Sequence, residues 1–402
     1  MPSCEGMGWA HGFAGSRSPP AKAFALGLQL EIAAGVSGEY GTKMDIAIRK
    51  PSELGAAERD AWREFVAADP ALGSPYFAVE FAECCEEARN DTRVLVVREN
   101  GQITGFLPFQ QGLVGYARPL GGPLSDVHGT IGEPGRESDP RAWLREAGIP
   151  VFEFHGALAS QRGFHEGAAE FDGSWMIDVS NGYEGWEAQR RTVSSKPLRN
   201  IATRYKRLNE VEGGYNFVMA DDRPDAFEKM IDWKREQYQT TGVFDVFSVP
   251  WTRKLLEAIM RRQCDHFSGV CSTLNIGGEI VAVHVGMMSD RVCQYWFPTF
   301  DRAYSTLSPG LLLLVETIRT AEALGQQGIE LGPGEFGFKK DLSTYQVPLA
   351  TGTFCTPSML GHLHQIGAAM VKSAEAAPLG PASAWPGKAM RKIDRLAGFY
   401  AA

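Results

Sequence analysis

The sequence predicts an α+β protein in which one folding plan occurs twice. Two segments, Thr92–Gln110 and Ser268–Met287, each contain a run rich in β-branched residues, a tight turn and a second apolar run. The turns are Asn100-Gly101 and Gly277-Gly278, and both favour the positive φ angles that a two-residue β-hairpin requires. We therefore expect one hairpin in each half of the chain.

Helical patterns precede each hairpin in the same order, which indicates an internal duplication. A strand is expected near residues 45–49 and again near residues 215–219. Two unrelated α+β domains are the alternative, because hairpins with glycine turns are common. The expected helices are Glu53–Val66 and Tyr76–Glu87 in the first half, and Asp225–Tyr238 and Trp251–Arg262 in the second.

The second hairpin continues into a third strand, a turn and a helix. Val292–Phe300 has the pattern of a strand, and Pro298 within it cannot donate a hydrogen bond to a neighbouring strand. We therefore expect a bulge or a splay between strands at this proline. The elements that follow are the turn Ser308-Pro309-Gly310, the helix Leu311–Leu324 closed by Gly325, and the strand Ile329–Leu331.

The first turn of this helix is suited to bind a phosphate. Ser308 is of a residue type that caps helices, Pro309 loses no hydrogen bond at the first helical position, and Gly310 lets a ligand approach the backbone. Free N–H groups and the helix dipole favour an anion there, so the turn is a candidate site for a nucleotide-type cofactor. An ordinary helix start is the alternative.

The first half lacks an equally clear continuation. Its hairpin is followed by the loop Arg118–Asp126, with no comparable helical pattern after it, so we expect a degenerate first half and a cofactor site in the second. We expect four parts in the chain: a disordered or wrongly started leader at 1–43, the two halves at 44–180 and 181–356, and a helical tail at 357–402.

Composition narrows the classes of function. The formal net charge of −8 and the pI near 5.6 argue against a general DNA-binding protein. The seven cysteines are scattered, with no C-x-x-C pair and no Cys/His cluster, which is typical of reduced thiols in the cytoplasm and predicts no metal site. No apolar run reaches the roughly eighteen residues that a transmembrane helix needs.

Two segments carry local positive charge. Glu184–Asn209 is a polar helical pattern with many basic residues, which suits either a polyanionic partner or, more simply, solvent. The end of the tail, Lys388–Leu396, is amphipathic and mildly basic. Docking on the body of the protein is expected for it, and weak contact with a membrane surface is the alternative.

Short motifs in the second half carry a resemblance to a known superfamily. They are Trp296-Phe297-Pro298, Leu307-Ser308-Pro309-Gly310 before the leucine run, and Gly334-Glu335 with Phe338-Lys339-Lys340. With them the chain resembles GNAT acyltransferases, in particular CelD-type proteins and BioF2-like acetyltransferases, and more distantly Fem-type aminoacyl transferases. Relatives have a tyrosine where Phe338 stands, so any role of that hydroxyl is absent here. The loop that ends in Ser125-Asp126 and the basic segment 198–208 also resemble the family.

The resemblance implies tandem GNAT-like domains, with a mixed central sheet whose strands splay and are flanked by helices. It implies acetyl-CoA or another acyl-CoA as the cofactor, with its pyrophosphate over the turn before the leucine run. A backbone N–H freed at the splay would bind the thioester oxygen. The cofactor-binding residues would be Trp296, Pro298, Leu307, Ser308, Pro309, Gly310, Leu311 and Lys339.

Acyl transfer also needs a base for the proton of the acceptor. Glu335 is the first candidate, because it follows a strand of the splayed core in a glycine-rich turn; a solvated loop carboxylate is the alternative. Asp301 and Tyr304 are further catalytic candidates at the end of the splayed strand, and the tyrosine would protonate a leaving thiolate. Asp126 and His284 are candidates for the substrate pocket, although His284 alternates with valines as a core histidine would.

The function expected from these features is CoA-dependent N- or O-acyl transfer in the cytoplasm. Family analogy suggests a small-molecule or glycan-precursor acceptor, such as a sugar or small amine linked to cellulose, exopolysaccharide or envelope synthesis. Aminoacyl transfer from tRNA, as in Fem-type proteins, is an alternative that the acidic composition disfavours. A non-catalytic GNAT-like scaffold of a polysaccharide synthase assembly is a third possibility.

Overall fold

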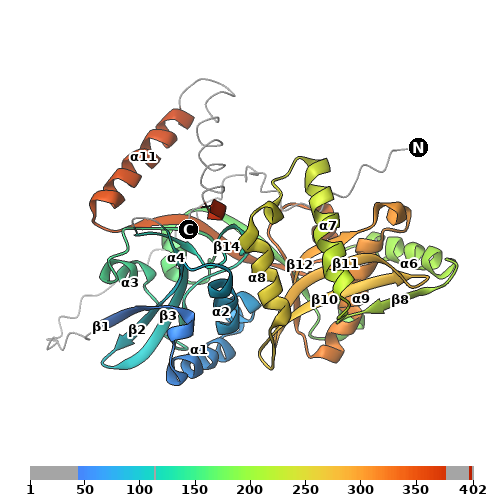
Figure 1. Ribbon diagram of the computed structural model, residues 1–402, viewed down its shortest axis with the longest axis horizontal. Helices are drawn as coiled ribbons and strands as arrows, with labels where there is room; N and C mark the ends of the chain where they lie inside the picture. Colours follow the sequence, from blue (N-terminus) through green and yellow to red (C-terminus); the bar gives the residue numbers. More distant parts are fainter. Residues whose placement is uncertain (1–43, 113–114, 377–397, 401–402) are drawn as a thin grey trace.

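The first half of the chain forms a sheet with helices on it, shown in Figure 1. The computed structural model describes residues 44–112, 115–376 and 398–400, so the leader and the basic end of the tail lie outside the described residues. The elements of the first half are β1 (Met44–Arg49), α1 (Ala56–Ala68), α2 (Val79–Ala88), β2 (Thr92–Glu99), β3 (Gln102–Gln111), β4 (Tyr116–Pro119), β5 (Ile131–Gly132), α3 (Pro140–Glu146), β6 (Val151–Leu158), α4 (Arg162–Gly167) and β7 (Ala168–Asp178).

The second half repeats this order after two connecting helices. Strand, two helices, hairpin, third strand, helix and strand follow one another as in the first half. The elements are α5 (Gly182–Val193), α6 (Lys196–Asn209), β8 (Tyr215–Val218), α7 (Pro224–Thr241), α8 (Pro250–Arg261), β9 (Gln263–Cys264), β10 (Phe267–Ile276), β11 (Glu279–Ser289), β12 (Val292–Phe300), α9 (Pro309–Ala321), β13 (Gly328–Gly332), α10 (Gly337–Leu342), β14 (Tyr345–Cys355) and α11 (Met359–Ala376).

Both predicted hairpins are confirmed. Asn100 and Gly101 have φ angles of 51° and 83°, and Gly277 and Gly278 have φ angles of 58° and 89°. Positive φ at both turn residues matches the right-handed twist of the flanking strands, which is why these residue pairs favour a two-residue turn. The predicted helix pairs before the hairpins are present as α1 with α2 and α7 with α8.

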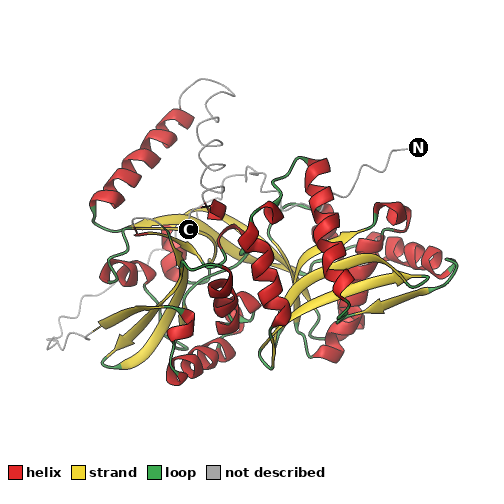
Figure 2. Cartoon of the chain, in the orientation of Figure 1, coloured by secondary structure: helices red, strands yellow, loops and turns green. Residues whose placement is uncertain are grey.

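The two halves exchange their last strands. The sheet order is β1-β2-β3-β4-β6-β14-β7-β13-β12-β11-β10-β8. β7, from the first half, pairs with β13 of the second, while β14, from the second half, pairs with β6 of the first and with β7. The result is a mixed sheet flanked by helices, as the fold class predicted (Figure 2). The boundary near residue 180 stays a prediction, because the sheet runs through both halves.

Two expectations about helices need correction. The pattern at Glu184–Asn209 is two helices, α5 and α6, because Pro197 lacks the N–H that would continue α5. The first half also completes the strand–helix–strand order, through α3 between the parallel strands β4 and β6. The sequence hides α3 because it is 7 residues long, against 13 for α9.

Helices cover both faces of the sheet in the second half. α7 and α8 pack against one face through Met230, Ile231 and Leu255, in an apolar cluster that continues into the first half. α5, α6 and α9 pack on the other face around Trp186 and Leu314. No helix of the described residues is long and apolar enough to cross a membrane.

Candidate active site

The strands β12 and β13 part from each other after three paired residues. They pair in parallel only where Val292–Gln294 meets Gly328–Glu330. Opposite β11, the register shifts so that β12 carries one extra residue between Gln294 and Phe297, which is a β-bulge. The predicted splay is therefore present, but the bulge at Tyr295 begins it, and Pro298 lies further along, paired with His284.

Two polar residues form the last pair between β12 and β13 before these strands part. Gln294 of β12 and Glu330 of β13 lie opposite each other, and both are buried. Glu330 accepts hydrogen bonds from the hydroxyls of Ser74, at 2.7 Å, and Ser174, at 2.9 Å. Burial raises the pKa of the Glu330 carboxyl, and these two hydrogen bonds work against that rise. Gln294 and Glu330, two polar residues inside apolar strands, therefore mark the point where β12 and β13 part. This point is called the fork below.

Asp126 reaches this fork from the first half. Gln294 Nε2 donates to Asp126 Oδ2 at 2.8 Å, and the side chain of Asp126 is only 8% exposed. A Cβ on Gly332 would lie 2.6 Å from the same oxygen, and Gly332 has a φ of +75°, so glycine is required there. Burial raises the pKa of Asp126 to about 7; Lys339 opposes this rise and Glu330 adds to it. This carboxyl can gain or lose a proton near neutral pH.

Lys339 is the buried cation beside Asp126. Its Nζ donates to the carbonyl oxygens of Gly332, at 3.1 Å, and Pro333, at 2.6 Å. Burial lowers its pKa to about 8, and the charge of Asp126 works against this shift. The sequence placed Lys339 in a surface turn as a cofactor ligand, whereas the helix α10 turns it inward.

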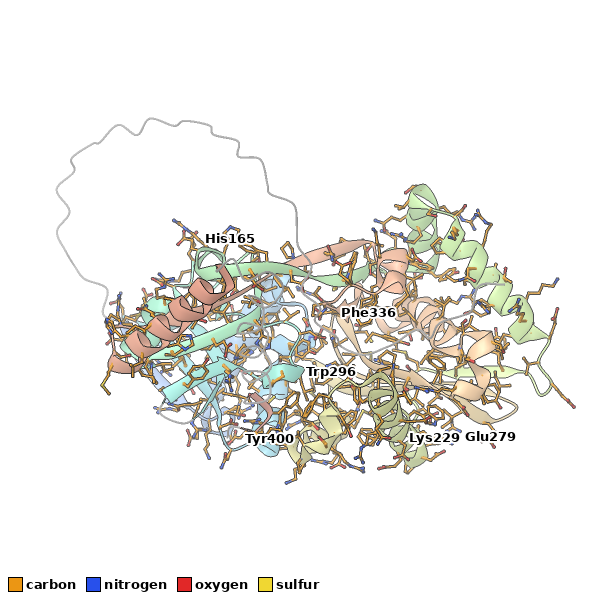
Figure 3. All side chains as sticks on the ribbon, turned by 90° about the horizontal axis from the view of Figure 1, so that it is seen from above. His165, Lys229, Glu279, Trp296, Phe336 and Tyr400 are labelled. Carbon is orange, nitrogen blue, oxygen red and sulfur yellow. The ribbon has the colours of Figure 1, made fainter. Side chains whose placement is uncertain are left out.

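Two aromatic side chains close the cluster. Tyr76 lies in the short 3₁₀ helix η3 (Pro75–Phe77); it accepts from Gln294 Nε2 at 3.4 Å and donates to the Leu124 carbonyl at 3.3 Å. Its ring meets Trp296 edge-on, with ring centroids 5.7 Å apart. Burial raises the pKa of Tyr76 well above its usual value, so the phenol stays protonated. Trp296 lies in the interior of the molecule, between the two halves (Figure 3).

The start of α9 keeps some features of the predicted phosphate site. Ser308 does not cap the helix with its side chain; instead its backbone is left-handed, at φ 57°, and its carbonyl accepts from Leu311 N and Leu312 N. Within the described residues the N–H of Gly310 has no acceptor. Arg204 of α6 donates to the Thr306 carbonyl at 2.7 Å, which brings one cation to this turn. Pro309 and Gly310 are themselves buried, and Leu307 is half-buried.

The three catalytic candidates from the sequence do not touch the buried cluster. Asp301 caps the 3₁₀ helix η7 (Arg302–Leu307) by accepting from Ala303 N at 2.9 Å. Tyr304 is half-buried and packs against the apolar cluster below α9. Glu335 is exposed, in the turn between β13 and α10. Catalytic roles for these residues stay predictions.

His284 is a core residue by its surroundings. It is fully buried; Nδ1 lies 3.1 Å from the Ser272 hydroxyl and Nε2 lies 3.3 Å from the Gln294 carbonyl oxygen. Its ring stacks on Tyr295 with centroids 4.1 Å apart. Burial lowers the pKa of His284 to about 3, so the imidazole is neutral. These contacts fit the alternative of a satisfied core histidine, and a role for His284 in the substrate pocket stays a prediction.

In the described part of the first half, the chain itself fills the position that corresponds to this opening. Among the described residues, β4 and β6 pair in parallel at Tyr116 and Ala117 only. Beyond them His128 takes the place beside β6: its N–H donates to Gly156 O, and its carbonyl accepts from Leu158 N, both at 2.9 Å. The same loop carries Asp126 to the second half. One loop therefore fills the space beside β6 in the first half, through His128. The same loop supplies Asp126 to the fork of β12 and β13 in the second half.

Comparisons with known proteins agree with this architecture. The model of the Acetyltransferase (GNAT) domain matches residues 195–340. The solved structure of FemX is similar, with a TM-score of 0.51 and 9% identity over 76% of this chain and 98% of that one. The protein therefore has a GNAT-type acyltransferase fold, and no curated protein matches it in sequence.

Two further solved structures resemble the chain at lower structural scores. A tandem GNAT protein from the clavulanic acid biosynthesis pathway has 11% identity over 79% of this chain and 100% of that one, with a TM-score of 0.46. The C-terminal domain of a proposed lysylphosphatidylglycerol synthetase from Agrobacterium fabrum has 13% identity over 78% of this chain and 96% of that one, with a TM-score of 0.45.

Proposed function

We propose that the protein is an acyl-CoA-dependent N- or O-acyltransferase whose reaction takes place where β12 and β13 part. The observation that supports this most is the buried carboxyl of Asp126, held by Gln294 at the fork and facing Lys339. A carboxyl with a pKa of about 7 is suited to take a proton at neutral pH. The GNAT domain match over residues 195–340 supports the same reaction class.

The residues of the second half fit a CoA thioester. Within the described residues, Gly310 offers an unpartnered N–H at the start of α9, and Arg204, bound to the Thr306 carbonyl, brings positive charge to the same turn, which suits phosphate groups. Bound acyl-CoA would supply the thioester carbonyl that the acceptor attacks. Beyond Gln294, β12 and β13 are no longer paired, and we place the thioester carbonyl of the bound acyl-CoA along this part of β12.

Asp126 is the base in this proposal and Lys339 supports it. The ionised carboxylate removes the proton of the acceptor's amine or hydroxyl, and the neighbouring ammonium stabilises the ionised form. Glu335, exposed in the turn between β13 and α10, is the second candidate for the role of the base. The acceptor we propose is a sugar or a small amine of glycan or envelope synthesis, in the cytoplasm, by family analogy.

A second candidate is aminoacyl transfer. The fold shared with FemX, at a TM-score of 0.51, is the observation that favours it. The third possibility, a non-catalytic scaffold, is disfavoured by the cost of burying Asp126, Lys339 and Glu330 together without a use for them.

Paired substitutions decide between the two candidate bases. With acetyl-CoA and a screened panel of amino sugars and small amines, Asp126→Asn should lower kcat by about 10²–10⁴-fold, because the amide keeps the shape and loses the basicity. The acid limb of kcat/KM near pH 7 should disappear with it. Glu335→Gln should keep most of the rate, and calorimetry should find acetyl-CoA affinity unchanged in both variants. Full activity of Asp126→Asn together with a slow Glu335→Gln would reverse the assignment.

A further inference from the structure

The segment Gly398–Tyr400 is anchored in the body of the protein. Phe399 is 2% exposed and belongs to the apolar cluster that spans both halves. Its ring centroid lies 5.0 Å from that of Phe244 and 6.1 Å from that of Trp251. The Trp251 indole N–H also donates to the Phe399 carbonyl at 2.8 Å. Ring packing and a hydrogen bond therefore hold Phe399 against Phe244 and Trp251.

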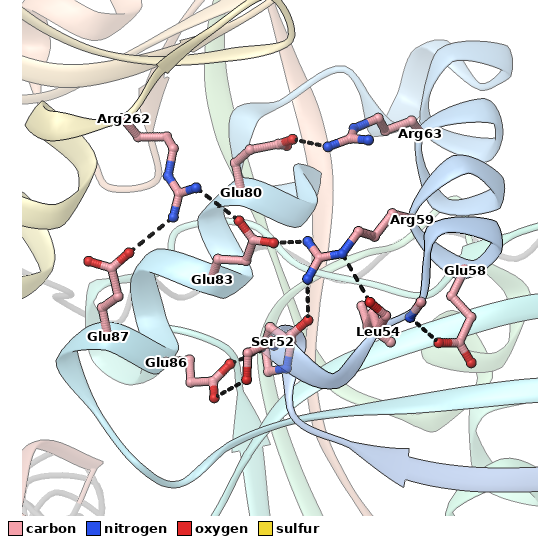
Figure 4. A network of polar contacts seen from close by, with 12 residues as sticks. Ser52, Leu54, Glu58, Arg59, Arg63, Glu80, Glu83, Glu86, Glu87 and Arg262 are labelled. Carbon is pink, nitrogen blue, oxygen red and sulfur yellow. Dashed lines mark hydrogen bonds and ion pairs between the residues drawn. The ribbon is translucent and has the colours of Figure 1, made fainter.

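The anchor lies where the two halves meet. Arg89, which follows α2, donates to the Gly398 carbonyl at 3.3 Å and stacks over Trp251 of α8 at 4.6 Å. Asp91 pairs with the same guanidinium at 2.5 Å, so the buried cation is balanced. Arg262, which directly follows α8, forms ion pairs with Glu83 and Glu87 of α2 (Figure 4). One dipeptide, Gly398-Phe399, therefore contacts both halves.

The anchor also touches the turn that carries Asp126. A Cβ on Gly398 would lie 2.7 Å from Pro123 Cγ, and a Cβ on Gly122 would lie 3.4 Å from the Gly398 carbonyl. On its other side the turn is held by Tyr76, whose hydroxyl donates to the Leu124 carbonyl. The turn is thus held between Gly398 and Tyr76, and Asp126 follows it directly in the chain.

We propose that Phe399 is a positioning residue: by anchoring Gly398 against Pro123 it holds the turn Gly121–Ser125, and so keeps Asp126 at the fork of β12 and β13. The proposal rests on the proposed function only for its catalytic consequence. Gly398 and Phe399 would then support the active site, although Phe399 does not touch Asp126.

The position of Asp126 has a property that can be measured without turnover. The groups that face its carboxyl are Tyr76 of η3, Gln294 of β12, Glu330 of β13 and Lys339 of α10. Burial among them is the main cause of its raised pKa, above the repulsion from Glu330. If the turn loosens and water enters, the pKa of Asp126 should fall toward 3.8. A loss of stability alone would not move it.

The experiment compares full-length Phe399→Ala and Phe399→Leu with the matched variant Phe65→Ala. Phe65 is a buried phenylalanine of α1 that packs on Phe106, so its removal deletes the same atoms at another place. Carbon NMR of the carboxyl groups, with Asp126 assigned by Asp126→Asn, gives the pKa directly. We expect Phe399→Ala to lower it by about one unit or more, Phe399→Leu by less, and Phe65→Ala not at all.

Each outcome decides the proposal. Equal Asp126 titration in the Phe399→Ala and Phe65→Ala proteins would overturn it, whatever their melting temperatures. If Phe399→Ala does not fold, the smaller change in Phe399→Leu is judged against Phe65→Ala in the same way. In the active enzyme, the acid limb of kcat/KM should shift with the NMR pKa. An Asp126→Asn enzyme with full rate would end the proposed catalytic role and leave the NMR result on positioning standing.

Discussion

At the scale of single residues, Lys234 is a lysine buried in the apolar core. It lies on the core-facing side of α7 between Met230 and Tyr238, is 1% exposed, and donates to Gln237 Oε1 at 3.3 Å. Burial, followed by repulsion from Lys339, lowers its pKa from 10.5 to about 7. A shift of that size corresponds to about 5 kcal/mol against the charged form. Lys234 is therefore a destabilising residue at low pH.

Lys234→Met should stabilise the protein, and more so at pH 6 than at pH 9. The lowered pKa means that the folded state binds fewer protons than the unfolded state between about pH 7 and 10.5, so the cost of Lys234 is complete below pH 7 and vanishes above 10.5. Methionine removes that cost and keeps most of the volume. Urea unfolding should show a gain of a few kcal/mol at pH 6. Lys254→Met, at an exposed position on α8, is the control.

If Lys234→Met is less stable than the native protein at both pH values, the lysine makes a favourable interaction that outweighs its desolvation. The control should change stability by less than about 0.5 kcal/mol, because exposed sites contribute little.

The residues of the candidate site were only partly accessible from sequence. Asp126 and Lys339 could be selected from their motifs, but their proximity in the fold depends on segments more than two hundred positions apart. Gln294 and Glu330 carry a local signal in the sequence, since each is a polar residue inside an apolar strand. Tyr76 gave none, because it lies in a pattern that read as the start of a helix.

At the scale of elements, the start of α9 is the feature that most affects cofactor binding. Ser308 adopts a left-handed conformation, which costs a non-glycine residue about 1 kcal/mol or more, and the tight turn it makes leaves Gly310 N–H without an acceptor in the described chain. The strained backbone of Ser308 at the start of α9 is compatible with a ligand site.

Gly310→Glu should abolish acetyl-CoA binding. The carboxylate puts bulk and negative charge where a pyrophosphate would lie, whereas an acidic residue in the first helical turn suits the helix dipole. Calorimetric titration measures the affinity, and circular dichroism verifies the fold. Gly367→Glu, at an exposed glycine of α11, makes the same change of charge elsewhere and should bind normally. Normal affinity in a folded Gly310→Glu protein would exclude this turn as the phosphate site.

The sequence predicts best those elements that are determined by residues close together in the chain. The hairpins follow from Asn100-Gly101 and Gly277-Gly278, which fix the turn geometry within two residues. The break between α5 and α6 was also local, since Pro197 stops a helix, but the continuous polar pattern concealed it. The short helix α3 has too few turns for periodicity to identify it.

At the scale of the whole molecule, the exchange of β7 and β14 binds the halves into one structure. Strand pairing partners are chosen by tertiary structure, so a duplicated pattern along the chain does not reveal that the last strands change places. The exchange has a consequence for folding, because β13 has β7 as its antiparallel neighbour along Gly328–Gly332 and would be an open edge without it.

A fragment that begins at residue 168 should therefore fold better than one that begins at residue 181. The two fragments, 168–402 and 181–402, differ by 13 residues that contain β7. The longer fragment keeps the strand that pairs with both β13 and β14, while the shorter one exposes the edges of both and the apolar residues that β7 covers, such as Ile177. We expect 168–402 to be soluble with a cooperative thermal transition, and 181–402 to aggregate or melt without cooperativity. Neither should transfer acyl groups, because both lack Asp126. If 181–402 alone melts cooperatively at the temperature of 168–402, the second half is complete without the exchanged strand, and the exchange is a packing detail that folding does not require.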